Sequence, residues 1–180
     1  SQVVHKWTAL HEDFLDRLYK STHQLITFEQ SDYYRTLTDL QLHIEWLPQE
    51  VDVTLVTTGI NRILLQYQKQ EMDFSTYHAD FTPWNMFMEN GQLFVFDWEY
   101  ARLTSPPKLD KYHFFTQTAY FEKHWSVSQI IEYINSENGK WIDREMYSLY
   151  LLEIISRFAI REKGNINREM VKSFQTWISL

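Results

Sequence analysis

The sequence predicts a mainly helical α+β fold in which a small β-hairpin unit interrupts a series of helices. Two observations carry this prediction. Apolar residues recur at three- and four-residue steps in both flanks of the chain, which is the period of amphipathic helices. Between the flanks, residues 74–101 (FSTYHADFTPWNMFMENGQLFVFDWEYA) contain short apolar and aromatic runs around an Asn-Gly pair, the strongest local signal for a hairpin.

Helices are predicted on both sides of this segment from apolar spacing and from residues that begin or end helices. Their approximate ranges are 2–20, 33–47, 52–70, 110–123, 128–136, 143–161 and 167–179. Pro48 ends the second helix, Asp143 can cap the sixth and Gly164 follows its end. Gly59 weakens the third, because a helical Gly costs about 1 kcal/mol relative to Ala.

Three short strands are predicted in the centre of the chain. The first is Ser75–Tyr77, and the next two are the runs NMFM and LFVFDW on either side of Glu89–Gln92. Asn-Gly suits the connection between them, because a type I′ turn needs two positive φ angles. We expect one domain over 1–180, helical over 1–72 and 105–180, with the loop and hairpin over 73–104.

The composition excludes several classes of partner. A content of 44% hydrophobic and 23% charged residues is ordinary for a soluble globular protein. The net charge is −7 and no basic stripe occurs, so no nucleic-acid partner is expected. No Cys is present, which excludes disulfides. No apolar run approaches the ~20 residues of a membrane helix and no signal peptide is visible, so we expect a cytoplasmic protein without a membrane span.

Four polar residues stand within the apolar centre of the chain. His78 and Asp80 follow the first predicted strand, Asn85 opens the hairpin, and Asp97 ends it. Because a hairpin brings its two ends together, these side chains can converge at one end of the β unit. Loops held by a rigid scaffold are the usual place for functional groups.

The chemistry of these groups suits a magnesium-dependent reaction. The amide oxygen of Asn85 and the carboxylate of Asp97 are hard ligands of the kind that Mg²⁺ prefers. Asp80, beside them, can accept a proton from a hydroxyl group or orient that group for attack. This combination suits phosphoryl transfer from a magnesium nucleotide, in which positioning and charge neutralisation supply most of the catalysis.

The segments HADFTPWN and FVFDWEYA resemble the catalytic segment of the aminoglycoside phosphotransferase and choline kinase family, relatives of protein kinases. The shared pattern is H-x-D-x-x-x-x-N, a hairpin, and an apolar-framed Asp. The resemblance implies that Asp80 is the catalytic base, that Asn85 and Asp97 bind magnesium, and that His78 supports the loop. The segment SPPKLDKYHF resembles the family's segment in which a buried Asp begins a helix and braces the catalytic loop, which implies that role for Asp110.

One neighbouring residue departs from the family pattern, and three others are possible ligand contacts. Ala79 stands where the family commonly has Gly and is expected to keep an ordinary φ. Trp84 and Trp98 flank the cluster and could stack on substrate or nucleotide, with core packing as the alternative. Glu99 could be a further ligand, or a solvated or salt-bridged side chain.

The resemblance implies the C-terminal lobe of a kinase-like protein that uses ATP and Mg²⁺ to phosphorylate a hydroxyl of a sugar, amino sugar or amino alcohol. No protein-kinase activation segment is evident between Asp97 and Pro106, which favours a small-molecule acceptor. The N-terminal nucleotide-binding lobe of such a protein carries a glycine-bearing loop and a strand lysine. The four glycines form no such loop, so we expect that lobe outside this sequence and the isolated chain to be inactive.

Two other functional classes remain open. A pseudokinase-like module would keep the fold and bind ligands without catalysis. A metal-dependent hydrolase could use His78, Asp80 and His113, but it lacks a full set of ligands at metal spacing and leaves Asn85 unexplained. The other histidines, and His113 outside that hydrolase hypothesis, are expected at surface or helix-packing positions.

Overall fold

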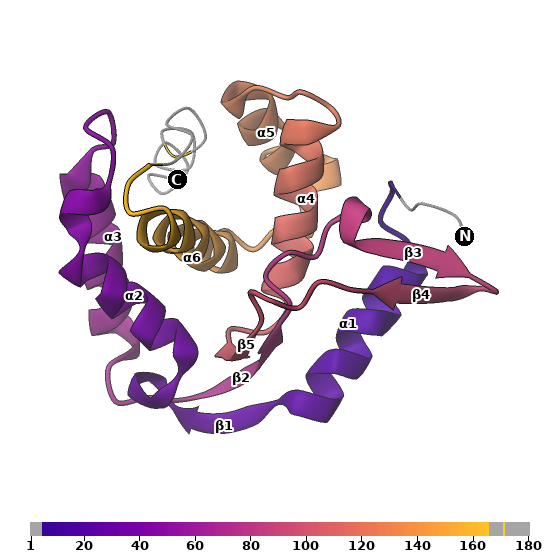
Figure 1. The fold of residues 1–180 in the computed structure, drawn as a ribbon, viewed down its shortest axis with the longest axis horizontal. Coiled ribbons are helices and arrows are strands. Elements are labelled where there is room, and N and C mark those ends of the chain that lie inside the picture. Colours follow the sequence, from indigo (N-terminus) through magenta and orange to yellow (C-terminus); the bar gives the residue numbers. More distant parts are fainter. Residues whose placement is uncertain (1–4, 166–170, 172–180) are drawn as a thin grey trace. The chain divides into compact units, whose positions relative to one another are not determined.

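The structure is a computed structural model that describes residues 5–165 and Val171 (Figure 1). The described helices are α1 (Ala9–Thr22), α2 (Asp32–Leu42), α3 (Val53–Tyr67), α4 (Leu109–Phe121), α5 (Val127–Ile134) and α6 (Arg144–Arg161). The described strands are β1 (Gln24–Thr27), β2 (Glu71–Tyr77), β3 (Met86–Glu89), β4 (Gln92–Val95) and β5 (Arg102–Ser105). The predicted α+β class with mostly helical content is therefore confirmed. None of the described helices is long and apolar enough to cross a membrane.

The chain forms two compact units, each built from two separate segments. Unit 1 takes Ser1–Leu25 and Asp73–Ser126, and its described part contains α1, the β3–β4 hairpin and α4. Unit 2 takes Ile26–Met72 and Val127–Leu180, and its described part contains α2, α3, α5 and α6. All the predicted site residues lie in unit 1. Organisation of the whole chain as a single domain stays a prediction.

Side-chain caps set the starts of the helices. Thr8 begins α1 by accepting a hydrogen bond from the backbone N–H of Leu10, so this helix starts later than the predicted residue 2. Asp52 caps α3 and Asp143 caps α6 in the same way, and Gly164 follows α6 with a φ of 83°.

Two of the predicted helix ranges need comment. Helix α2 ends at Leu42, five residues before the predicted end, and a short 3₁₀ turn over Ile44–Trp46 completes the segment before Pro48. The predicted last helix, 167–179, lies outside the described residues except for Val171.

The predicted hairpin is confirmed. Strands β3 and β4 pair antiparallel from Met86 opposite Val95 to Glu89 opposite Gln92, which leaves a two-residue loop. The loop residues Asn90 and Gly91 have φ angles of 51° and 73°, as a type I′ turn requires.

The two faces of this hairpin differ, because successive strand residues point to opposite sides. One face packs in the core of unit 1 through Met86, Met88, Leu93 and Val95. The rings of Phe87 and Phe94 stack on the other face with their centroids 5.1 Å apart.

A three-stranded sheet of order β1-β2-β5 completes the strands. Strand β2 starts at Glu71, earlier than the predicted Ser75, and its antiparallel pairing with β5 is irregular between Ser75 and Tyr77. The sequence analysis missed β1 and β5. Each has only four residues and no clear apolar alternation, so their pairing with β2 defines them.

The core of unit 2 is helical. Helices α2 and α6 pack side by side, with Leu37 and Leu40 of α2 and Ile154 of α6 fully buried. The Tyr33 hydroxyl donates to the Leu149 carbonyl at 2.8 Å, and burial raises the pKa of Tyr33 well above its ordinary value.

Candidate functional site

The loop between β2 and β3, residues 78–85, is held by a carboxylate of α4. The Asp110 side chain accepts hydrogen bonds from the backbone N–H groups of His78, at 2.9 Å, and Ala79, at 3.1 Å. Asp110 lies in the first turn of α4 and is only 2% exposed. Two bonds to a charged acceptor satisfy two buried donors, so this carboxylate braces the start of the loop.

Ala79 adopts a φ of 74°, so the expectation of an ordinary φ is wrong. Left-handed backbone costs a non-glycine residue roughly 1–2 kcal/mol. The bond from the Ala79 N–H to Asp110 helps to hold this conformation in the buried loop. Such stored strain is typical of functional loops.

His78 ties the loop to the end of the hairpin. Its Nδ1 accepts from the backbone N–H of Asp80 at 3.1 Å, and its Nε2 lies 2.8 Å from the carbonyl oxygen of Phe96. Because Nδ1 is an acceptor, the proton of the neutral ring belongs on Nε2, which donates to Phe96. The Phe96 N–H in turn donates to the Asn85 carbonyl at 3.0 Å. Both the N–H and the carbonyl of Phe96, the residue directly before Asp97, are therefore held by hydrogen bonds.

Asp80 receives two side-chain donors. The Asn85 amide nitrogen lies 2.7 Å from Asp80 Oδ2 and 3.0 Å from the Asp80 carbonyl oxygen. The Nε2 atom of His113 lies 3.2 Å from Asp80 Oδ1. The Asp80 side chain remains 26% exposed, so a hydroxyl group can still reach its carboxylate.

The environment of Asn85 determines which way its amide faces. Two acceptor oxygens of Asp80 surround the amide nitrogen, and exchanging the nitrogen and oxygen of the amide would set oxygen against oxygen. The Asn85 Oδ1 atom therefore faces away from Asp80. Among the described residues, no donor to this oxygen is found. It is a hard ligand atom, and the backbone carbonyl of Asn85 accepts from the Phe96 N–H directly before Asp97.

Asp97 follows the fixed Phe96 and has a φ of 62°. Its side chain is exposed, and no described residue forms a hydrogen bond or ion pair with its carboxylate. Residues 96–99 are all exposed, so this carboxylate avoids the cost that burial would carry. An exposed carboxylate on a strained backbone suits contact with a ligand.

The oxygen atoms of Asn85 and Asp97 suit magnesium, which also keeps waters and substrate phosphates as ligands, better than a metal whose ligands all come from the protein. Within the described ranges, no group of three or more His, Asp and Glu side chains is placed to hold a metal ion. Magnesium commonly uses one or two carboxylates, waters and the phosphates of its substrate, so Asn85 and Asp97 fit it. The hydrolase hypothesis loses support, because both ring nitrogens of His78 already have partners.

The other three predicted contacts lie at the edge of the site. The Trp98 ring packs 4.5 Å from His78, between centroids, and its Nε1 donates to the Val95 carbonyl, while 39% of the residue is exposed. Trp84 is 45% exposed and lies edge-on to Phe121. Glu99 is exposed. Trp98 thus has a packing role at the support of the loop, and all three keep surface for a ligand.

The sequence analysis grouped His113 with Asp80 only in the hydrolase hypothesis, as a possible metal ligand, and gave it no role in the phosphotransferase site. Its side chain is 2% exposed, and it follows Asp110 by three positions on α4. Residues three apart lie on the same face of a helix. The signal was therefore present: a His one turn after the Asp that braces the loop.

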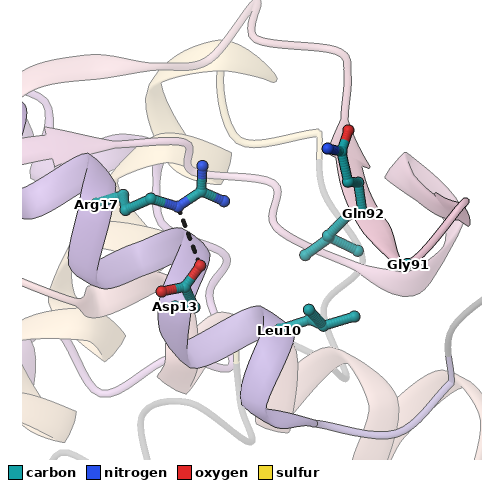
Figure 2. Close-up of a pocket in the computed structure, with 6 residues that line it drawn as sticks. Leu10, Asp13, Arg17, Gly91 and Gln92 are labelled. Carbon is teal, nitrogen blue, oxygen red and sulfur yellow. Dashed lines mark hydrogen bonds and ion pairs between the residues drawn. The ribbon is translucent and has the colours of Figure 1, made fainter.

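A separate cavity of about 400 Å³ lies beside the hairpin turn in unit 1 (Figure 2). It is lined by Leu10, Asp13, Arg17, Gly91, Gln92 and Leu93. The Arg17 Nε donates to Asp13 Oδ2 at 3.1 Å, so the two charges in its wall offset each other. None of the predicted site residues lines this cavity, and it contains no unpaired charge that would select a ligand.

Comparisons with known proteins add no relative: family models, curated proteins and solved structures were all searched, and none matches this chain.

Proposed function

We propose that this chain carries the catalytic and magnesium-binding residues of an ATP-dependent phosphotransferase that acts on a hydroxyl of a sugar, amino sugar or amino alcohol. The observation that carries the proposal is the Asp80–Asn85 pair. The amide nitrogen of Asn85 holds the Asp80 carboxylate, its amide oxygen faces away from Asp80, and its backbone carbonyl accepts from the N–H of Phe96, directly before Asp97. One loop thus presents a base and a metal ligand in a fixed arrangement.

The chemical roles follow from the exposure and partners of each group. Asp80 would accept the proton of the acceptor hydroxyl, or orient that hydroxyl toward the phosphoryl group. Asn85 and Asp97 would hold Mg²⁺, whose charge offsets that of the nucleotide phosphates. The brace of Asp110 and the contacts of His78 keep these groups in register.

The nucleotide-binding lobe, which would bind the phosphates of ATP, is proposed to lie outside this sequence. Of the described residues, only Gly91 and Gly164 are glycines with positive φ, and they lie in a hairpin turn and after α6. The isolated 180-residue chain is therefore expected to bind ATP weakly. Calorimetry that gives a micromolar ATP affinity for this chain alone would contradict this part of the proposal.

The test is a kinase assay of the full-length protein that contains this chain. A panel of sugars, amino sugars and amino alcohols is incubated with Mg²⁺ and ATP labelled at the γ-phosphate, and labelled products are identified by mass spectrometry. Transfer to at least one acceptor is expected. Binding of Mg-ATP without transfer to any acceptor would instead favour a pseudokinase-like module.

Metal-ligand variants add the residue-level test. Replacing Asn85 or Asp97 by Ala should weaken both Mg-ATP binding and turnover, because each change removes a metal-binding oxygen. Asn61→Ala is the matched control, since Asn61 is an exposed amide of unit 2 that pairs only with the side chain of Gln41. Unchanged Mg-ATP affinity in both site variants would contradict the assigned metal-binding roles.

A further inference from the structure

We propose that His113 is a positioning residue that fixes the plane of the Asp80 carboxylate through a hydrogen bond from Nε2 to Oδ1. The expected effect of His113 on turnover rests on the proposed function. The pairing of His113 with Asp80 rests on the geometry alone. His113 lies outside the motif that carries the resemblance, so nothing in that pattern assigns it a role.

The first step is the geometry of the carboxylate. The terminal torsion of an Asp side chain has a broad energy well, so a single hydrogen bond leaves its plane free to rotate. Here Asn85 donates to Oδ2 at 2.7 Å and His113 lies 3.2 Å from Oδ1. Two donors on the two different oxygens hold the plane of the group. A base whose lone pairs point in a fixed direction needs no rearrangement when the acceptor hydroxyl arrives.

The second step is the rigidity of the donor. The His113 side chain is 2% exposed and projects from the middle of α4, whose first turn carries Asp110. Asp110 accepts from the loop backbone at His78 and Ala79, and His113 donates to the same loop at Asp80. One helix face thus presents an acceptor and, one turn later, a donor to a single loop. The carboxylate is therefore positioned by a packed helix as well as by its own loop.

The third step separates positioning from ordinary packing. A buried imidazole needs some hydrogen-bond acceptor, and a backbone carbonyl would suffice. The acceptor here is the partly exposed carboxylate proposed as the base. An imidazole with a proton on Nε2 can donate this bond in its neutral or its cationic form, so the role does not depend on a change of charge.

The kinetic experiment compares two variants of the full-length protein. His113→Leu removes the donor, and His113→Gln supplies an amide N–H near the former Nε2. We expect His113→Leu to lower kcat by roughly 10- to 100-fold, by analogy with the loss seen when a residue that orients a metal ligand is replaced. Mg-ATP affinity and the KM for the acceptor should each change by less than about threefold, because neither ligand touches His113. His113→Gln should recover most of the turnover.

The matched control is Thr118→Val in the same helix. Thr118 is buried, and its hydroxyl donates only within α4, to the carbonyl oxygens of Phe114 and Phe115. This variant should keep the turnover of the unaltered protein. Turnover of His113→Leu within twofold of the unaltered protein would overturn the proposal. Equal losses in His113→Leu and His113→Gln at equal thermal stability would overturn it as well.

A nuclear magnetic resonance measurement tests the pairing without any activity. In protein labelled with ¹⁵N at histidine, the Nε2 resonance of His113 should move in the Asp80→Asn variant, because a charged acceptor becomes neutral. The exposed Asp13→Asn variant, altered in a different ion pair of unit 1, should leave that resonance in place. If Asp80→Asn does not move it, the proposal is overturned. A protein that phosphorylates no acceptor refutes the proposed function, and the resonance shift still decides the pairing.

Discussion

The loop and hairpin of unit 1 and the helical core of unit 2 bury different chemistry. Unit 2 buries mainly aliphatic side chains, and its buried Tyr33 and Ser156 each donate to a backbone carbonyl of a packed helix. Its buried Glu153 faces Arg157 one turn along the same helix, at 3.8 Å. These three buried polar side chains of unit 2 thus face helix backbone or a neighbour on the same helix.

Unit 1 buries polar side chains that connect distant parts of the chain. Asp110 and His113 bind a loop more than thirty residues earlier, and His78 binds the carbonyl of Phe96, directly after β4. The same region holds Ala79 in a left-handed conformation. Buried polar groups and strained backbone both oppose folding. Their concentration in one loop supports the proposal that this loop carries the functional site, and unit 2 has no such loop among its described residues.

The largest expected effect is on turnover, and it tests whether the loop of unit 1 carries the catalytic base. Asp80→Asn in the full-length protein should lower kcat by roughly 10²- to 10⁴-fold, the usual contribution of a general base, and leave Mg-ATP affinity nearly unchanged. Steady-state kinetics and calorimetry measure the two quantities. Asp13→Asn is the control, because Asp13 is exposed and pairs with Arg17 within α1. A loss of less than about tenfold would count against Asp80 as the base.

The next effect compares carboxylates in the two units. Asp110→Ala leaves the buried N–H groups of His78 and Ala79 without their carboxylate, at about 1–3 kcal/mol each, so the free energy of unfolding should fall by roughly 2–6 kcal/mol. Asp52→Ala removes the cap of α3 in unit 2, a single bond to the Leu55 N–H, and should cost only about 1 kcal/mol. Urea titrations measure both. Equal losses would show that the loop of unit 1 does not depend on its brace.

Acidification should weaken unit 1 through His11. Burial among aromatic rings lowers the pKa of His11 to about 4 from an ordinary value of 6.5. Between pH 6.5 and 4, His11 is protonated in the unfolded chain and stays neutral in the folded chain. The contribution of neutral His11 to the free energy of unfolding is therefore full above pH 6.5 and is lost as the pH falls toward 4. At about 1.4 kcal/mol for each pH unit of the shift, the loss is on the order of 3 kcal/mol.

His11→Gln is the matched variant for this pH effect. The Nδ1 atom of His11 accepts from the Thr8 N–H at 3.0 Å, and Gln at this position can accept the same bond in a capping box without titrating. We expect the unaltered protein to lose stability more steeply than His11→Gln between pH 6.5 and 4, as measured by urea midpoints. Parallel curves would refute the role of His11.

The smallest effect concerns backbone strain. Ala79→Gly removes a left-handed penalty of roughly 1–2 kcal/mol and adds about 0.5–1 kcal/mol of chain entropy to the unfolded state, for a net gain of up to about 1.5 kcal/mol. Lys163→Gly, at a φ of 48° after α6, is the counterpart in unit 2. Thermal unfolding measures both gains. Only Ala79→Gly should also lower turnover, because it loosens the loop that carries Asp80; unchanged turnover would show that the strain has no positioning role.

The sequence by itself determined the features that short stretches of chain can specify. The turn of the hairpin needs only Asn90 and Gly91, whose conformations are local. Asp143 marks a predicted helix start because a cap binds an N–H three residues away. The positions of Asp80 and Asn85 within one loop also allowed the sequence to predict that their side chains lie close together.

Only the tertiary structure decided the features that depend on residues distant in sequence. Strand β5 exists through its pairing with β2, and the φ of Ala79 is supported by a carboxylate 31 residues later. The exposure of Asp97 follows from the outward course of the chain after β4, and the contact of His113 with Asp80 spans 33 residues. Local propensity contains no information about such contacts, because they form only when the packing of α4 against the loop brings the two segments together.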